Sequence, residues 1–157
     1  RAMSQGPVLF AYDGSAHART AIERAGGVLQ PGPAVVATAW TSFEEQAPAA
    51  LIAMSRDMVR ETVQTLDDAN RDDAEACAAE GAELARAAGF DAEPRAVRSK
   101  GPFFAALLHA ADELDARAIV AGSRGRSSLA SAVLGSVSTG LLHHTSRPVL
   151  VVRAEDG

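Results

Sequence analysis

Five strand-like runs alternate along this chain with longer stretches of helical periodicity, and this alternation limits the possible fold more than any other feature. Runs that are apolar almost throughout are typical of strands buried on both faces, as in a parallel sheet. A strand–helix alternation places helices on both sides of such a sheet. The sequence therefore predicts an α/β fold, a three-layer α/β/α sandwich around a five-stranded parallel sheet. The expected strands are Val8–Tyr12, Ala34–Trp40, Asp91–Arg98, Arg117–Ala121 and Arg147–Arg153.

The helical stretches are marked by caps and by apolar residues at helical spacing. Ser15 is a candidate N-cap for the first helix. Its apolar face is expected to comprise Ala18, Ala21, Ile22, Ala25, Val28 and Leu29.

Three further helices are expected after the second, third and fourth strands. After a loop over 41–48, a long helix is predicted from Ala49 to Ala88, with a candidate interruption at Asp67–Asn70 and Gly89 as its C-terminal stop. The next helix opens at Gly101-Pro102, and the last runs from about Ser136 to His144. Pro94 and the charges around it favour an edge position for the third strand.

Length and charge restrict the function classes. The 157 residues suit a single domain, expected over residues 7–154, with residues 1–6 as a vector-derived or disordered N-terminus. The net charge of −5 argues against a broad nucleic-acid surface. A single cysteine, Cys77, allows no intrachain disulfide and fits a reducing cytoplasm. There is no apolar stretch of membrane-spanning length, so no membrane partner is expected.

The glycine-rich segment after the fourth strand is the strongest functional signal. It contains Gly122-Ser-Arg-Gly125 and, nine residues later, Gly135-Ser136 ahead of the last helix. Glycine allows close approach of the backbone to a ligand, and the first N–H groups of a helix have no partner inside that helix. Such a loop and helix start can hold a phosphate group.

A second loop is expected at the same edge of the sheet. Asp13-Gly14-Ser15 follows the first strand as Gly122 follows the fourth. In open parallel sheets ligands bind beyond the carboxyl ends of the strands, where the winding direction reverses. If the first and fourth strands are neighbours, both loops face one crevice.

These motifs together resemble the universal stress protein family, and the resemblance spans Val8 to Arg153. The four segments that carry it are Val8-Leu-Phe-Ala-Tyr-Asp-Gly-Ser15, Ile119-Val-Ala-Gly-Ser-Arg-Gly125, Leu134-Gly-Ser-Val-Ser138 and Arg147-Pro-Val-Leu-Val-Val-Arg153. The ATP-binding branch of that family has the pattern Gly, two residues, Gly, nine residues, Gly, Ser or Thr. The spacing here matches without departure.

The resemblance implies a Rossmann-like fold, similar to the adenine nucleotide alpha hydrolases, with strand order 3-2-1-4-5. It also implies a cytoplasmic stress-response module that binds ATP, with Mg²⁺ or Mn²⁺, and a homodimer formed through Val149, Leu150, Val151 and Val152. The implied nucleotide site comprises Asp13, Ala39, Trp40, Gly122, Arg124, Gly125, Gly135, Ser136, Val137 and Ser138. Asp13 would lie on the adenosine side or reach a phosphate-bound metal, and Ala39 and Trp40 would border the adenine.

Simpler roles remain open for several of these residues. Asp13 can equally serve as a turn and cap residue, and Arg124 and Arg126 can be solvated loop charges. Trp40 can pack under a loop, and the acidic run from Asp67 to Asp73 can be a solvated helix face. The last strand can be covered by the chain's own helices instead of a second subunit.

Three other functions remain open beside nucleotide-dependent signalling. One is a slow ATPase or autophosphorylating enzyme using Ser136, Ser138 or Thr139. The second, a nucleotidyl-transferring or ATP-pyrophosphatase relative, is disfavoured because the first loop lacks His-x-Gly-His and Ser-Gly-Gly-x-Asp-Ser. The third is an interaction protein whose glycine loop binds nothing. The lack of a Gly-x-x-x-x-Gly-Lys-Ser/Thr motif removes the usual phosphate-loop lysine and favours binding over fast chemistry.

Overall fold

The five strands form one parallel sheet in the computed structural model, which describes residues 5–125 and 134–154. The order across the sheet is β3-β2-β1-β4-β5, which confirms the order 3-2-1-4-5. Val8 of β1 is in register with Ala34 of β2 on one side and with Ala118 of β4 on the other. The strands are β1 (Val8–Ala11), β2 (Pro33–Thr41), β3 (Asp91–Ser99), β4 (Ala118–Gly122) and β5 (Val149–Val152).

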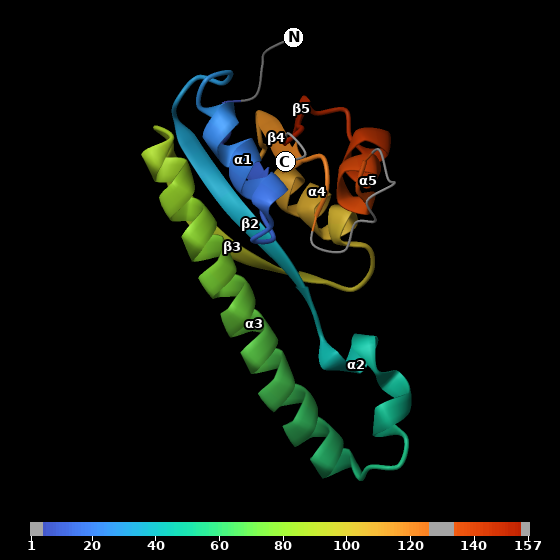
Figure 1. Cartoon of the computed structure of the whole chain (residues 1–157). Helices are drawn as coiled ribbons and strands as arrows, with labels where there is room; N and C mark the ends of the chain where they lie inside the picture. Colours follow the sequence, from blue (N-terminus) through green and yellow to red (C-terminus); the bar gives the residue numbers. More distant parts are fainter. Residues whose placement is uncertain (1–4, 126–133, 155–157) are drawn as a thin grey trace.

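Helices cover both faces of this sheet, which confirms the three-layer prediction (Figure 1). On one face, Val8 and Phe10 pack with residues of α1 and α3. On the other, Leu9 and Ile119 pack with residues of α4 and α5. Because successive side chains of a strand point to opposite faces, the sheet contributes to two separate hydrophobic cores. The helical elements are α1 (Ala16–Ala25), α2 (Phe43–Gln46), η1 (Pro48–Leu51), α3 (Arg56–Ala87), α4 (Phe103–Glu113) and α5 (Ser136–His144).

Helix α1 has the predicted N-cap, but its C-terminal end differs from the prediction. Ser15 accepts a hydrogen bond from Ala18 N at 3.2 Å, as expected of an N-cap. The helix ends at Ala25, with Gly26 as its C-cap, earlier than predicted. Val28 is consequently exposed and does not belong to the apolar face, whereas Leu29 still packs against the core from the following turn.

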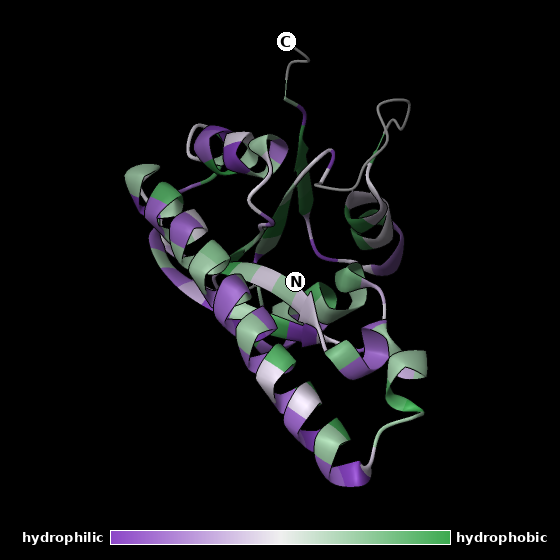
Figure 2. Cartoon of the chain, turned by 60° about the horizontal axis from the view of Figure 1, so that its bottom comes forward, coloured by the Kyte–Doolittle hydropathy of each residue, from purple (hydrophilic) through white to green (hydrophobic). Residues whose placement is uncertain are grey.

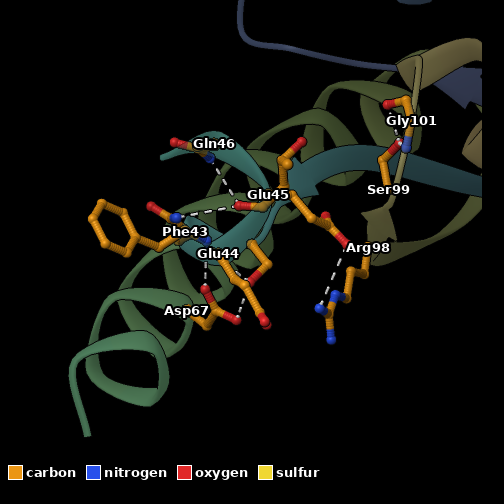
Figure 3. A network of polar contacts seen from close by, with 11 residues as sticks. Phe43, Glu44, Glu45, Gln46, Asp67, Arg98, Ser99 and Gly101 are labelled. Carbon is orange, nitrogen blue, oxygen red and sulfur yellow. Dashed lines mark hydrogen bonds and ion pairs between the residues drawn. The ribbon is translucent and has the colours of Figure 1, made fainter. Parts of the chain in front are cut away.

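The long helix differs from its prediction at its start and in its middle. It begins at Arg56, because Ala49 lies in the short 3-10 turn η1. It runs without a break through Asp67–Asn70, and Gly89, with φ of 101°, follows its end as predicted. The loop expected over 41–48 contains α2, whose first turn is held by Asp67: its carboxylate accepts hydrogen bonds from Ser42 Oγ (2.7 Å) and Phe43 N (2.8 Å) (Figure 3).

The first half of α3 extends beyond the sheet. Its buried residues begin only at Ala74, and part of the preceding stretch lies beside α2 (Figure 1). Apolar and polar residues alternate along this extension (Figure 2). None of the helices in the described ranges combines the length and the apolar character that crossing a bilayer requires.

Candidate functional site

A cavity of about 590 Å³ opens where the carboxyl ends of β1 and β4 lie side by side. This is the reversal point of the sheet, because β2 follows β1 to one side and β4 and β5 extend to the other. Its volume is within the usual range for small-molecule pockets. The cavity brings together Asp13, Ala39, Gly122, Arg124, Gly125, Gly135, Ser136, Val137 and Ser138, all of which were predicted for the site.

Asp13 shapes the turn after β1 and also lines the cavity. Its Oδ1 accepts a hydrogen bond from Ser15 N at 2.9 Å, which shapes the turn after β1. Gly14 in this turn has φ of 80°, a conformation that favours glycine. The same carboxylate lines the cavity, where it is the only acidic side chain among the described lining residues.

The three glycines of the motif serve different purposes. A Cβ at Gly122 would lie 2.8 Å from the backbone carbonyl of His17, so this glycine lets β4 approach the start of α1. A Cβ at Gly125 would lie 2.7 Å from Asp13 Oδ2, so Gly125 leaves room for that carboxylate. At Gly135 the nearest atom would be Arg124 Cα at 3.3 Å, which places this glycine directly against the loop.

The start of α5 faces the cavity through Ser136 and Val137. Gly135 is its N-cap and supplies no side-chain cap, so the first amide groups of α5 have no hydrogen bond from such a cap. The Ser138 hydroxyl is buried and donates to Gly122 O at 2.5 Å, which ties α5 to the end of β4. The side chain of Ser138 therefore has a structural partner, and a role toward a ligand is left to its backbone.

Of the two arginines in the glycine loop, Arg124 and Arg126, the structure describes only the first. Arg124 is half-buried and lines the cavity, which gives this edge a cationic side chain. Arg126 lies outside the described residues.

The structure brings Ala39 to the cavity but not Trp40. Successive side chains of a strand point to opposite faces of the sheet. Ala39 is on the face covered by α4 and α5, with Ala37. Trp40 is therefore directed to the other face, where the guanidinium of Arg98 lies 5.9 Å from its ring centroid.

One wall of the cavity was missed by sequence reasoning. It is formed by the turn between β3 and α4 and by the first turns of α4, with the residues Gly101, Pro102, Phe103, Phe104 and Leu107. The signal was present, because Gly101-Pro102 follows a strand whose carboxyl end lies at the same edge of the sheet.

Tyr12 is a further lining residue that the sequence analysis did not assign to the site. Its side chain is buried, and its hydroxyl donates to Glu80 Oε1 at 2.5 Å, while Glu80 pairs with Arg19 at 2.6 Å. Burial, and then the hydrogen bond to Glu80, raise the pKa of Tyr12. The hydroxyl therefore stays protonated at neutral pH and braces α3 against the loop after β1.

The described residues contain no group of three or more His, Cys, Asp or Glu side chains that could hold a metal ion. Among the described lining residues, Asp13 offers the one carboxylate. This donor set suits Mg²⁺ bound mainly by phosphate oxygens of a ligand, with one protein carboxylate, because Mg²⁺ commonly uses one or two carboxylates together with substrate phosphates.

Residues 6–153 match the sequence model of the Universal stress protein family. The chain belongs to this family. A curated universal stress protein from Mycolicibacterium smegmatis (strain ATCC 700084 / mc(2)155) is 49% identical over 41 residues, which are 26% of this chain and 14% of that relative. The chain thus matches only a small part of that relative's length.

Two solved structures resemble the fold over nearly its whole length. The hypothetical protein MJ0577 superposes with a TM-score of 0.77 at 19% identity, covering 97% of this chain and 98% of that one. A universal stress protein solved in complex with cAMP has a TM-score of 0.60 at 28% identity, covering 97% and 98%. The second structure shows that a member of this family holds an adenine nucleotide.

Proposed function

We propose that this universal stress protein binds ATP in the cavity at the reversal point of the sheet and changes its shape or its choice of partner in response. The observation that carries the proposal is the meeting of two loops at one edge: Asp13 after β1 and the glycine loop after β4 line the same cavity as the start of α5. The complex of a family member with cAMP supports an adenine nucleotide as the ligand.

The triphosphate would be held by several weak donors acting together. A helix start contributes about 0.3–1 kcal/mol toward an anion. Micromolar binding requires about 8 kcal/mol, so the amides of α5, the glycine-loop backbone and Arg124 must converge on the phosphates. Gly122, Gly125, Gly135 and Ser136 would lie along the phosphates and ribose, and Ala39 would border the base.

A divalent ion fits this arrangement as a component of the ligand. Mg²⁺ or Mn²⁺ would be bound by phosphate oxygens and by the Asp13 carboxylate. Bound in this way, the ion screens the charges of neighbouring phosphates from one another. Asp13 would keep its Oδ1 on Ser15 N, which fixes the carboxylate in place.

The protein is proposed to act as a homodimer in the cytoplasm. A homodimer would form through β5, which lies at the edge of the sheet and is apolar throughout. The single cysteine and the family fit a cytoplasmic stress-response role.

Slow hydrolysis or autophosphorylation is the second candidate. Its phosphate acceptor would be Ser136, which lines the cavity, since the Ser138 hydroxyl already donates to Gly122 O.

Mass spectrometry of protein purified without added nucleotide tests both candidates. The binding proposal predicts that ATP is released intact on denaturation and that the chain carries no phosphate. ADP together with a phosphorylated Ser136 would favour the enzyme. An empty protein that also fails to take up added ATP would contradict both.

A further inference from the structure

Much of the cavity lining is apolar and lies outside the phosphate-binding loops. The charged side chains among its described lining residues, Asp13 and Arg124, both belong to the loops after β1 and β4. The rest of the lining includes a floor of small residues from three strands and a wall from the start of α4. The floor residues are Ala11, Ala37, Ala39 and Ala121.

Two adjacent phenylalanines in this wall have different surroundings. Phe104 supports the fold: a Cβ at Gly140 of α5 would lie 2.1 Å from its ring, and its centroid is 4.9 Å from that of His144. Phe103 lines the cavity and remains 42% exposed. In the described part of the chain it has no ring partner, since the aromatic pairs there are Phe10–Phe90 and Phe104–His144.

A ligand that covers an exposed aromatic ring at a cavity is stabilised by the burial of that ring. Burial of apolar area is favourable by about 25 cal/mol per Å². Aromatic rings gain a further amount from offset or edge contacts with other planar rings. The small alanine side chains of the floor leave space in the cavity that Phe103 also lines, and larger side chains at these positions would fill it.

The position of Phe103 depends on Ser99 at the end of β3. Ser99 is 1% exposed, and its hydroxyl lies 2.7 Å from Gly101 O, to which it donates. Gly101 N donates back to Ser99 Oγ at 3.4 Å (Figure 3). Pro102, the N-cap of α4, makes no side-chain cap, so in the described structure the turn ahead of Phe103 is held by Ser99.

We propose that Phe103 is the stacking platform for the base of the bound nucleotide and that Ser99 is a positioning residue for this platform. This inference rests on the proposed function and deepens it. It assigns recognition of the base to the β3–α4 turn, which lies outside the glycine motif. The ligand class is thus a phosphate compound with a planar base.

Calorimetric titration with two ligands, Mg-ATP and inorganic tripolyphosphate, tests the proposal. Phe103→Ala should weaken ATP binding about tenfold, a loss typical of an aromatic contact, and should leave tripolyphosphate binding unchanged. Phe103→Trp should keep ATP affinity. Ser99→Ala should weaken ATP binding about threefold, because the turn ahead of Phe103 loses the hydrogen bonds of the Ser99 hydroxyl, again without affecting tripolyphosphate.

The matched control is Leu142→Ala, which removes an exposed apolar side chain of α5 that is not among the cavity-lining residues. It should bind both ligands as the parent chain does. Adenine absorbance gives an independent readout: the decrease on stacking should be present with the parent chain and absent with Phe103→Ala.

Two results would overturn the inference while leaving the proposed function intact. One is unchanged ATP affinity in Phe103→Ala with the absorbance decrease retained. The other is an equal loss of both ligands, which would mean that Phe103 shapes the whole cavity. If the folded parent chain binds neither ligand, the proposed function itself fails.

Discussion

At the scale of single residues, the three glycines of the motif have different structural roles. Gly122 is needed for packing, because its missing side chain lets β4 lie against the backbone of His17. Gly125 makes room for the Asp13 carboxylate, and Gly135 faces the loop at the start of α5. The family resemblance assigned all three to the phosphates and ribose, whereas close approach between protein segments already requires a glycine at position 122.

Gly122→Ala should therefore lower the stability of the fold. The added Cβ would meet backbone atoms of His17 at 2.8 Å, which cannot turn away as a flexible side chain could. Overpacking of this kind costs about 1–3 kcal/mol. For a domain of this size each kcal/mol lowers the unfolding midpoint by about 2–4 °C in a thermal scan.

The control for this substitution is Gly101→Ala. A Cβ at Gly101 meets no atom within 4 Å, and the backbone there is not in the left-handed region. Its unfolding midpoint should stay within about a degree of the parent or rise slightly, since alanine restricts the unfolded chain. Equal midpoints for all three proteins would show that β4 and α1 can separate at little cost.

At the scale of elements, strands were predictable and the ends and breaks of helices were less so. The apolar runs identify their strands because burial on both faces leaves few alternatives. Asp67 was interpreted as a possible interruption of α3, but its carboxylate caps α2 from a distance of 24 residues in the chain. The local sequence pattern cannot distinguish an aspartate that ends its own helix from one that caps a different helix.

Trp40 illustrates the same limit within the site. Its place at the end of β2 correctly indicated the edge of the sheet where the cavity lies. The face on which its ring falls depends on strand alternation relative to Ala39, and this places it beside Arg98. The β3–α4 wall was missed because it lacks a recognised phosphate motif, although chain order alone placed it at the right edge.

The edge strand β5 yields a prediction about assembly. Pro148 O, directly before β5, accepts a hydrogen bond from Ile119 N of β4, and Val152 O of β5 accepts one from Ser123 N, directly after β4. Since backbone groups alternate along a strand, the N–H groups of Val149 and Val151 point to the open side. Val151→Pro removes one of these outward donors without breaking the pairing with β4.

If two chains pair through β5, Val151→Pro should convert a dimer into a monomer in light-scattering measurements after gel filtration. Its far-ultraviolet circular dichroism should match that of the parent. Ala16→Pro, at the exposed first position of α1, is a control outside this strand and should remain dimeric, because proline is well tolerated at the first position of a helix. A dimer that persists in Val151→Pro would place the interface elsewhere.

At the scale of the whole molecule, the parallel topology brings separate segments of sequence to one edge. Loops after β1 and β4, the start of α4 and the start of α5 meet there around about 590 Å³ of space. The two hydrophobic cores hold the strands in register and so fix the positions of these loops. Each loop therefore contributes only a short motif of a few residues to the site. This arrangement leaves the extended half of α3 outside the site.

Isothermal titration calorimetry of the intact chain with Mg-ATP, beside the Gly135→Val variant, addresses the central claim most directly. A valine at this position would carry its methyl groups toward Arg124 and Gly125, where the phosphates are expected. The account predicts binding in the micromolar range for the parent and none for the variant, with both proteins folded by circular dichroism. Absence of heat from the folded parent at millimolar Mg-ATP, or equal affinities for the two proteins, would contradict it.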